Sequence, residues 1–126
     1  MNFKLFLAIT VTLLILDLLW LGVVAKNFYS KELGEQLKSP PNWTGAILVY
    51  ILLVVGIYLF VFGSTFATSR ISIVLLGALL GLIIYGVYEF TNLALVTGWP
   101  LKVVIVDIIW GIFLSGFASF VGSFFR

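Results

Sequence analysis

Residues 71–95 read ISIVLLGALLGLIIYGVYEFTNLAL, a long apolar run in which Glu89 is the single charged side chain. A helix needs about 20 apolar residues to cross about 30 Å of bilayer hydrocarbon. This run is both long enough and apolar enough to do so. It therefore predicts a transmembrane helix and decides the class of fold.

Three further stretches of the chain meet the same requirement. Of the 126 residues, 63% are hydrophobic and 10% are charged, whereas a globular domain is about half apolar and about a quarter charged. The connections at residues 67–70 and 96–100 allow only tight hairpins, so neighbouring helices should be antiparallel. We predict an all-α membrane protein, one integral domain over residues 1–126, with four antiparallel transmembrane helices at about residues 3–25, 44–66, 71–95 and 101–124.

The one long connection lies between the first two predicted helices. In it Tyr29, Leu33 and Leu37 recur at a spacing of four, which suits a short amphipathic segment at the membrane surface near residues 27–37. Gly34 lies inside this segment and disfavours a helix there. A solvated loop therefore stays open as the alternative.

The ends of the predicted helices carry aromatic and basic residues. Trp43 and Trp99 fall at helix entrances on one side of the bundle, where interfacial anchors are expected. Basic residues barely distinguish the two sides, with three on one and four on the other, so both orientations in the membrane stay open. The three are Lys4, Arg70 and Arg126, and the four are Lys26, Lys31, Lys38 and Lys102.

The composition excludes several classes of chemistry. The chain has no Cys and no His, which removes disulfides, Cys/His zinc sites, His-ligated haem and every nucleophile activated by His. Its net charge of +2 is too small and dispersed to indicate nucleic-acid binding. Membrane lipid is the expected partner, and the chain is compatible with a homo-oligomer.

Three carboxylates lie inside the predicted helices, namely Asp17, Glu89 and Asp107. Each costs about 2.5–3.5 kcal/mol or more at mid-membrane unless it faces a partner or a wet cavity. Counted along their helices at 1.5 Å per residue, all three lie roughly 9–12 Å below the side of the long connection. The sequence thus predicts three acids at one level of the bundle.

Helical spacing gives these acids polar and aromatic neighbours. Tyr85, Tyr88, Glu89 and Asn92 form one stripe on the third predicted helix. The pattern D-x-x-W occurs twice, on antiparallel helices, and places each Trp on the face of its Asp. We therefore predict a substrate or ion site at Asp17, Trp20, Tyr85, Tyr88, Glu89, Asn92, Asp107 and Trp110, and Tyr50 falls near the same depth. Gly77 and Gly81 continue the stripe as GxxxG, which permits close helix packing.

Two interpretations of the acids stay open. Each acid could simply hydrogen-bond to a neighbouring helix and stabilise the bundle, for about 0.6–2 kcal/mol. Three carboxylates at one depth cannot all stay ionised at low dielectric, however, so some hold protons or the cluster holds a cation. A hard metal ion such as Mg²⁺ bound by Asp17, Glu89 and Asp107 is one form of this, and no other cofactor is expected.

The ordered motifs resemble a bacterial family of predicted four-helix membrane proteins, domain-of-unknown-function family 2177. The motifs are D-x-x-W-L-G in the first helix, F-Y and L-G in the connection, Y-x-x-Y-E-F-T-N-L-A in the third helix, then G-W-P-L and V-D-x-x-W-G. The family pattern reads Y-D-L-T-N where this chain has Glu89-Phe90, which retains the carboxylate. The resemblance implies the fold, a bacterial inner (plasma) membrane location, and importance for Asp17, Trp20, Glu89, Asn92, Trp99, Pro100, Asp107 and Trp110. It implies no activity.

Three functions remain in order of preference. The first is binding or transport of a proton or small cationic solute through the carboxylate and aromatic site. The second is a lipid-modifying enzyme or its accessory subunit, which is less favoured because no nucleophile motif or catalytic residue is recognisable. The third is a structural assembly subunit whose acids only hold helices together.

Overall fold

The computed structural model of the protein describes residues 1–38 and 40–126. Within these residues the secondary structure is helical throughout. Five α-helices are joined to shorter helical segments, in the order α1 (Phe3–Leu19), η1 (Trp20–Val24), α2 (Lys26–Leu33), η2 (Gly34–Gln36), α3 (Trp43–Gly56), η3 (Ile57–Val61), α4 (Arg70–Leu95) and α5 (Leu101–Gly122).

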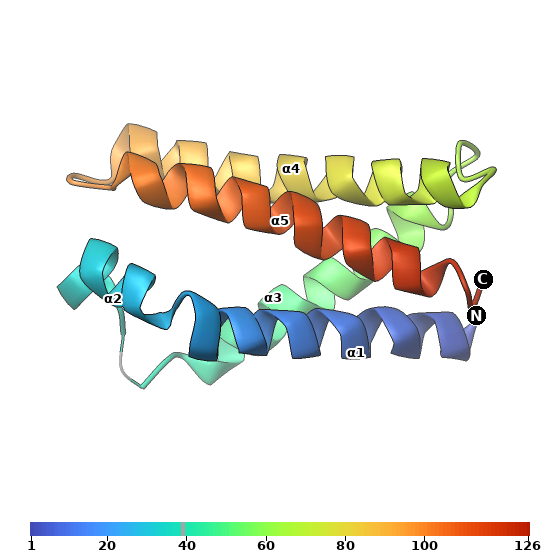
Figure 1. Ribbon diagram of the computed structural model, residues 1–126, viewed down its shortest axis with the longest axis horizontal. Helices are drawn as coiled ribbons and strands as arrows, with labels where there is room; N and C mark the ends of the chain where they lie inside the picture. Colours follow the sequence, from blue (N-terminus) through green and yellow to red (C-terminus); the bar gives the residue numbers. More distant parts are fainter. Residues whose placement is uncertain (39) are drawn as a thin grey trace.

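Four helical stretches are long and apolar enough to cross a membrane, which confirms the predicted fold class. They are Phe3–Val24, Trp43–Val61, Arg70–Leu95 and Leu101–Gly122. In Figure 1 the colour changes in opposite directions along successive long helices, and both chain termini lie at the end of the bundle opposite α2. The bundle therefore has a terminal end and an α2 end.

The second span is shorter than its hydropathy indicated. Residues 44–66 were expected to be helical, but the helix ends at Val61 and a turn follows. A Cβ at Gly63 would lie 2.3 Å from the carbonyl oxygen of Leu59, so only glycine fits this turn. Beyond it, the carbonyl of buried Ala67 accepts a hydrogen bond from the Arg126 guanidinium at 2.7 Å. The predicted helix was too long because the connection after Val61 is also apolar. This connection is held at the terminal end of the bundle by the hydrogen bond from Arg126.

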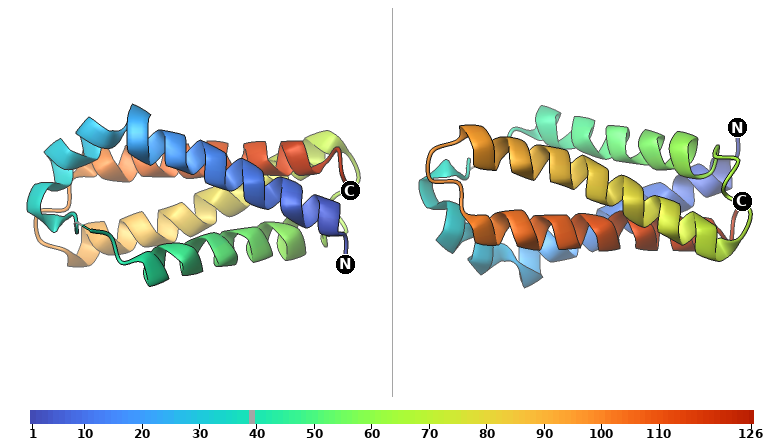
Figure 2. Two further views of the ribbon diagram at one scale, coloured as in Figure 1. Left: turned by 90° about the horizontal axis from the view of Figure 1, so that it is seen from below. Right: turned by 90° about the horizontal axis from the view of Figure 1, so that it is seen from above.

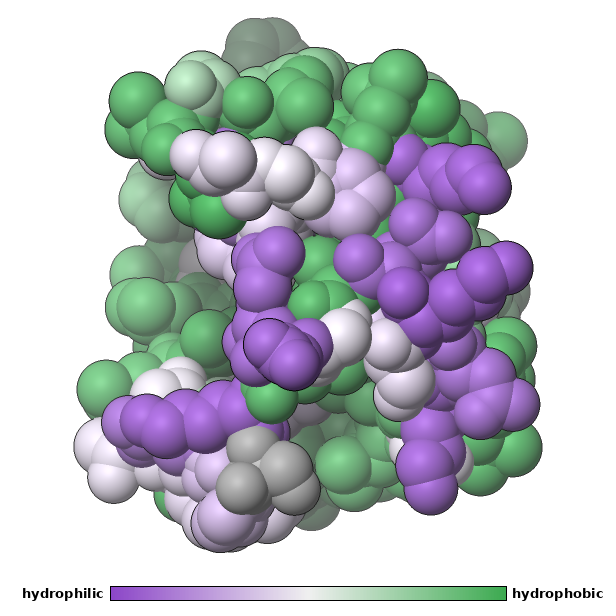
Figure 3. All heavy atoms as spheres, turned by 90° about the vertical axis from the view of Figure 1, so that its left-hand side faces the viewer, coloured by the Kyte–Doolittle hydropathy of each residue, from purple (hydrophilic) through white to green (hydrophobic). Residues whose placement is uncertain are grey.

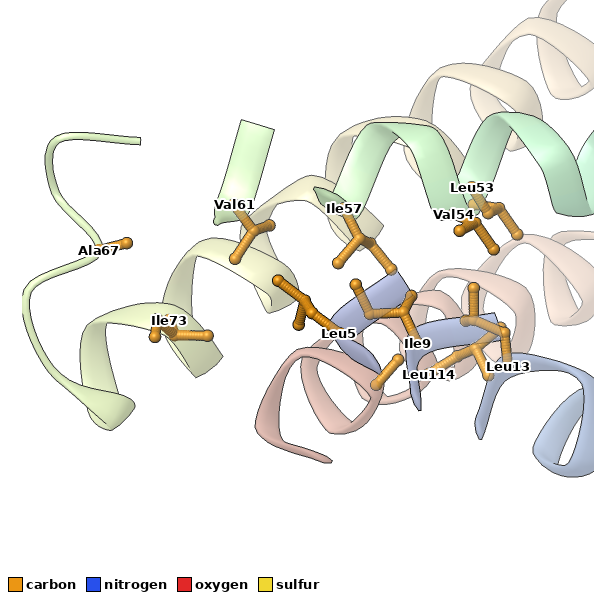
Figure 4. Close-up of a cluster of buried hydrophobic side chains, with 11 residues drawn as sticks. Leu5, Ile9, Leu13, Leu53, Val54, Ile57, Val61, Ala67, Ile73 and Leu114 are labelled. Carbon is orange, nitrogen blue, oxygen red and sulfur yellow. The ribbon is translucent and has the colours of Figure 1, made fainter. Parts of the chain in front are cut away.

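A cluster of buried apolar side chains fills the bundle from its middle to the terminal end (Figure 4). It is made of Leu5, Ile9, Leu13, Leu53, Val54, Ile57, Val61, Ala67, Ile73, Leu114 and Ala118. Removal of this surface from water would stabilise a soluble protein, but in a bilayer close van der Waals packing supplies most of the helix association. The acids lie outside this cluster, toward the α2 end.

Helices α4 and α5 pack closely through small residues. A Cβ on Gly77 would lie 2.1 Å from Ser119 Oγ, and one on Gly81 would lie 2.1 Å from the Gly111 carbonyl oxygen. There is no room for a side chain at either position. Both glycines are therefore needed for the close approach of α4 and α5, as the GxxxG pattern predicts. A Cβ on Gly111 would in turn meet the ring of Tyr85 at 2.3 Å. The same packing therefore sets where the Tyr85 ring lies.

The α2 end carries the hydrophilic surface. Figure 3 looks onto this end and shows hydrophilic side chains gathered there, with hydrophobic ones around the sides. The surface helix expected at residues 27–37 is present in part: α2 ends at Leu33, and Gly34 follows with a φ of 51°. That left-handed backbone conformation suits glycine and stops the helix. The turn before α2, at buried Ala25, folds α2 back onto the bundle.

Candidate functional site

Asp17 joins three helices in the interior of the bundle. Its side chain is only 7% exposed. Trp110 of α5 donates its indole N–H to Asp17 Oδ1 at 3.0 Å, and the Tyr50 hydroxyl of α3 donates to Oδ2. Hydrogen bonds to a charged group contribute about 1.5–3 kcal/mol each. Both oxygens of this carboxylate are thus satisfied, as a helix-locking role requires.

The two D-x-x-W motifs meet through their tryptophans. The rings of Trp20 and Trp110 are stacked, with 4.4 Å between centroids and 6° between planes. Trp110 donates to the Asp of the other motif, Asp17. Trp20 donates its indole N–H to the Tyr29 hydroxyl at 3.0 Å, and that hydroxyl donates to Asp107 Oδ1. Each tryptophan therefore supports the acid of the opposite helix, one directly and one through Tyr29.

Tyr29 is a site residue that the sequence did not identify. Its spacing placed it on the face of a surface helix, but α2 folds back and brings its hydroxyl to Asp107. Burial and then the hydrogen bond to Asp107 raise the pKa of Tyr29 above its ordinary value. The phenol therefore stays protonated and remains a donor. The sequence signal for this residue was the F-Y motif of the family resemblance, Phe28-Tyr29, and the motif did not indicate what the tyrosine does.

Glu89 is fully buried, and its two oxygens differ. Oε1 accepts a hydrogen bond from the Trp99 indole N–H at 3.1 Å, whereas Oε2 has no partner among residues 1–38 and 40–126. Trp99, which was expected to be an interfacial anchor, also serves as the donor to this acid. The carboxyl groups of Glu89 and Asp107 lie within hydrogen-bonding reach of each other.

Glu89 and Asp107 need a proton if their carboxyl groups are to bond to each other. An ionised carboxylate only accepts hydrogen bonds, so the two groups can bond to each other only if one carries a proton. A buried carboxylate oxygen without a donor is costly. One proton between Glu89 and Asp107 would let one carboxyl group donate to the other. The arrangement can thus hold a proton that both acids share.

A pocket of about 370 Å³ opens beside the acids at the α2 end. It is lined by six of the predicted site residues, Asp17, Trp20, Tyr85, Tyr88, Asp107 and Trp110. Lys26, Tyr29 and Leu33 of α2 also line it. Two predicted residues are not among the described lining residues: Glu89 is fully buried, and Asn92 follows it by about one turn on α4. The pocket has carboxylates within aromatic walls and one ammonium group from α2.

The three acids do not form one metal-ligand group. Within residues 1–38 and 40–126, no three acidic side chains gather closely enough to hold a single metal ion. Asp17 and Asp107 both line the pocket, but each is held by its own tyrosine. The acids are therefore arranged as one satisfied carboxylate and one close pair.

Fold and site define a polytopic α-helical membrane protein with hydrogen-bonded carboxylates between its helices. The model of the predicted membrane protein family DUF2177 matches residues 2–124, and the chain belongs to that family. No curated protein and no solved structure matches the chain.

Proposed function

We propose that the protein binds a proton between Glu89 and Asp107 and a small cationic solute in the adjoining pocket, and that it exchanges the two across a bacterial inner membrane. The observation that carries this proposal is the buried Glu89 Oε2, which lacks a donor while a second carboxyl group lies within reach. A shared proton removes this defect and leaves one negative charge on the pair.

The adjoining pocket suits a cation by both charge and wall chemistry. Asp17 and Asp107 supply negative charge, and the Trp20 and Trp110 rings and Tyr85 supply aromatic faces. A cation over an aromatic face gains about 0.5–2 kcal/mol, and more where water is excluded. Loss of the shared proton would raise the negative charge of the Glu89–Asp107 pair from one to two. A bound cation would offset the added charge, so cation binding and proton release should occur together.

Lys26, an exposed residue, is among those that line the same pocket. Its flexible stem allows the ammonium group to stay hydrated at this exposed position. An incoming cation would displace this group toward water. In this proposal the exposed lysine competes with the solute for the negative charge of the pocket.

One acid fits the assembly interpretation better than the transport interpretation. Asp17 has a donor on each oxygen and contacts α3 and α5 from α1. Its role in this proposal is mainly to hold the pocket together. Glu89 and Asp107 are the pair that changes protonation.

Proton release on cation binding tests the proposal. Tetraethylammonium is a suitable probe because it carries no exchangeable proton. Its addition to the protein in weakly buffered lipid nanodiscs should release protons, detected with a pH-indicating dye. Glu89→Gln should abolish the release, whereas Glu35→Gln, at an exposed acid of η2, should leave it unchanged. Wild-type protein that neither binds the probe nor releases protons would contradict the proposal.

A further inference from the structure

A second cavity, of about 510 Å³, lies between α3 and α4. Figure 1 shows α3 crossing obliquely, near α4 where their hairpin joins them and away from it toward the α2 end; Figure 2 gives the same helices from two further sides. The lining is Val49, Leu52 and Leu53 of α3 with Ile84, Tyr85 and Tyr88 of α4. We call this cavity the α3/α4 groove.

The groove opens toward the lipid. Val49 is 52% exposed and Leu52 is 70% exposed. On a helix that crosses a membrane, such side chains face acyl chains. Apart from the two tyrosine hydroxyls, the groove presents apolar side chains. An alkyl chain could therefore leave the bilayer for the groove with little change in its surroundings.

The groove and the polar pocket share a wall. Tyr85 and Tyr88 line both cavities. Two other described cavities, between α1 and α3 and along the outer face of α4, share no lining residue with the polar pocket. Among the described apolar cavities, the α3/α4 groove is therefore the one that shares lining residues with the polar pocket.

We propose that the α3/α4 groove admits the apolar chain of an amphipathic amine from the bilayer while its cationic head binds beside Asp107 in the polar pocket. This inference rests on the proposed cation site and names its substrate class. A charged head cannot remain in the apolar groove, because an unpaired charge there is costly. The carboxylate and aromatic walls beyond Tyr85 offer the nearest compensation. The two cavities together fit a molecule with one charged end and one alkyl chain.

Tyr85 is the residue at which head and chain would meet. Its ring rests on Gly111, where a Cβ would lie 2.3 Å from ring carbon Cδ1. Gly111→Ala would therefore displace the ring that lines both cavities. The absence of a side chain at position 111 thus leaves room for the ring between the groove and the polar pocket.

Photoaffinity labelling tests this inference on the full-length protein in nanodiscs of zwitterionic lipid. The probe is a dodecylamine that bears a diazirine near the end of its chain, and labelled residues are identified by mass spectrometry. We expect adducts concentrated on residues 49–53 and 84–88. Dodecylamine should reduce them several-fold by competition, and dodecanol should not. Equal labelling of all lipid-facing surfaces, or equal competition by the alcohol, would overturn the inference.

Two matched variants locate the entrance. Val49→Trp fills the α3/α4 groove, whereas Ile51→Trp fills the groove between α1 and α3, and the two positions are 52% and 51% exposed. Val49→Trp should reduce specific labelling several-fold, and Ile51→Trp should leave it unchanged. The reverse result would place the entrance between α1 and α3. If Val49→Trp fails to fold, the distribution of adducts on the wild-type chain still decides.

This test separates the inference from the proposed function. Tetraethylammonium has no long chain, so its binding and proton release do not need the groove. Proton release by tetraethylammonium without amine-specific labelling would overturn the groove inference and leave the proposed cation site intact. Loss of both would overturn both.

Discussion

Trp20 and Trp110 stack face to face, with 4.4 Å between ring centroids and 6° between ring planes. The contact joins the end of the first span to the middle of α5 at the level of the acids. Such aromatic pairs contribute about 0.5–1.5 kcal/mol beyond the area that they bury. Each indole N–H also leads to an acid of the other D-x-x-W motif. The repeated motif is therefore one structural unit formed by two helices.

Trp110→Phe keeps a ring in the stack and removes one donor. Asp17 Oδ1 would then lose its hydrogen bond from the indole in a nearly buried position. We expect a loss of about 1–3 kcal/mol in the free energy of unfolding. Unfolding by sodium dodecyl sulfate in mixed micelles measures this. Trp43→Phe, at a 64% exposed ring, is the control and should change stability by less than about 0.5 kcal/mol. An equal effect at both positions would contradict the role of the indole N–H.

Gly81→Ala should destabilise the protein although it replaces none of the acids. The added Cβ would lie 2.1 Å from the Gly111 carbonyl oxygen, so α4 and α5 must separate. Overpacking of this kind costs about 1–3 kcal/mol. Gly86→Ala on the same helix is the control, because its Cβ would meet its nearest described neighbour at 4.0 Å. Thermal denaturation in detergent should show a lower midpoint for Gly81→Ala than for Gly86→Ala.

Glu89→Gln and Asp107→Asn should separate activity from stability. An amide N–H can take the place of the shared proton and give the neighbouring carboxylate a donor. We therefore expect folding and thermal stability close to those of the wild type, together with loss of cation-linked proton release. Amide variants that unfold as readily as Gly81→Ala would instead favour a purely structural role for the pair.

Tyr29→Phe should lower stability in a pH-dependent way. The change removes the donor to Asp107 and the acceptor of the Trp20 indole, at a cost of about 1–3 kcal/mol. The pKa of Tyr29 is raised in the folded protein, by burial and then by the bond to Asp107. The stability that Tyr29 supplies is therefore fully present below pH about 10, the ordinary value of the unfolded chain, and is lost as pH rises further.

Alkaline unfolding curves of wild type and Tyr29→Phe check this prediction. The gap between the two curves should be constant at neutral pH and should narrow above pH about 10. Tyr58→Phe, which removes only an acceptor for the Asn2 backbone N–H, is the control. A gap that widens with rising pH would contradict the protonated, donating role of Tyr29.

The sequence predicted the parts of the site that helical periodicity can place. Spacing along one helix relates Glu89 to Tyr85, and counting from the membrane surface brings Asp17 and Asp107 to one depth. The family-like motifs pointed to the same acids. Periodicity thus recovers residues that share a helix face or a depth.

Helical periodicity could not predict which side chain donates a hydrogen bond to each acid. Tyr29 reaches Asp107 because the chain turns at Ala25, and Trp99 reaches Glu89 from a connection. Both depend on how short segments fold back, which no helical repeat encodes. The sequence also treated the three acids as equivalent. Their donors, which come from other elements, distinguish satisfied Asp17 from the Glu89–Asp107 pair.

Infrared titration of the protein in nanodiscs tests the shared proton most directly. At neutral pH the wild-type spectrum should contain the carbonyl stretch of a protonated carboxylic acid. Glu89→Gln and Asp107→Asn should each remove that band, and Asp17→Asn, provided that it folds, should retain it. A wild-type spectrum that lacks the band at neutral pH, or one in which only Asp17→Asn removes it, would contradict the assignment of the proton to Glu89 and Asp107.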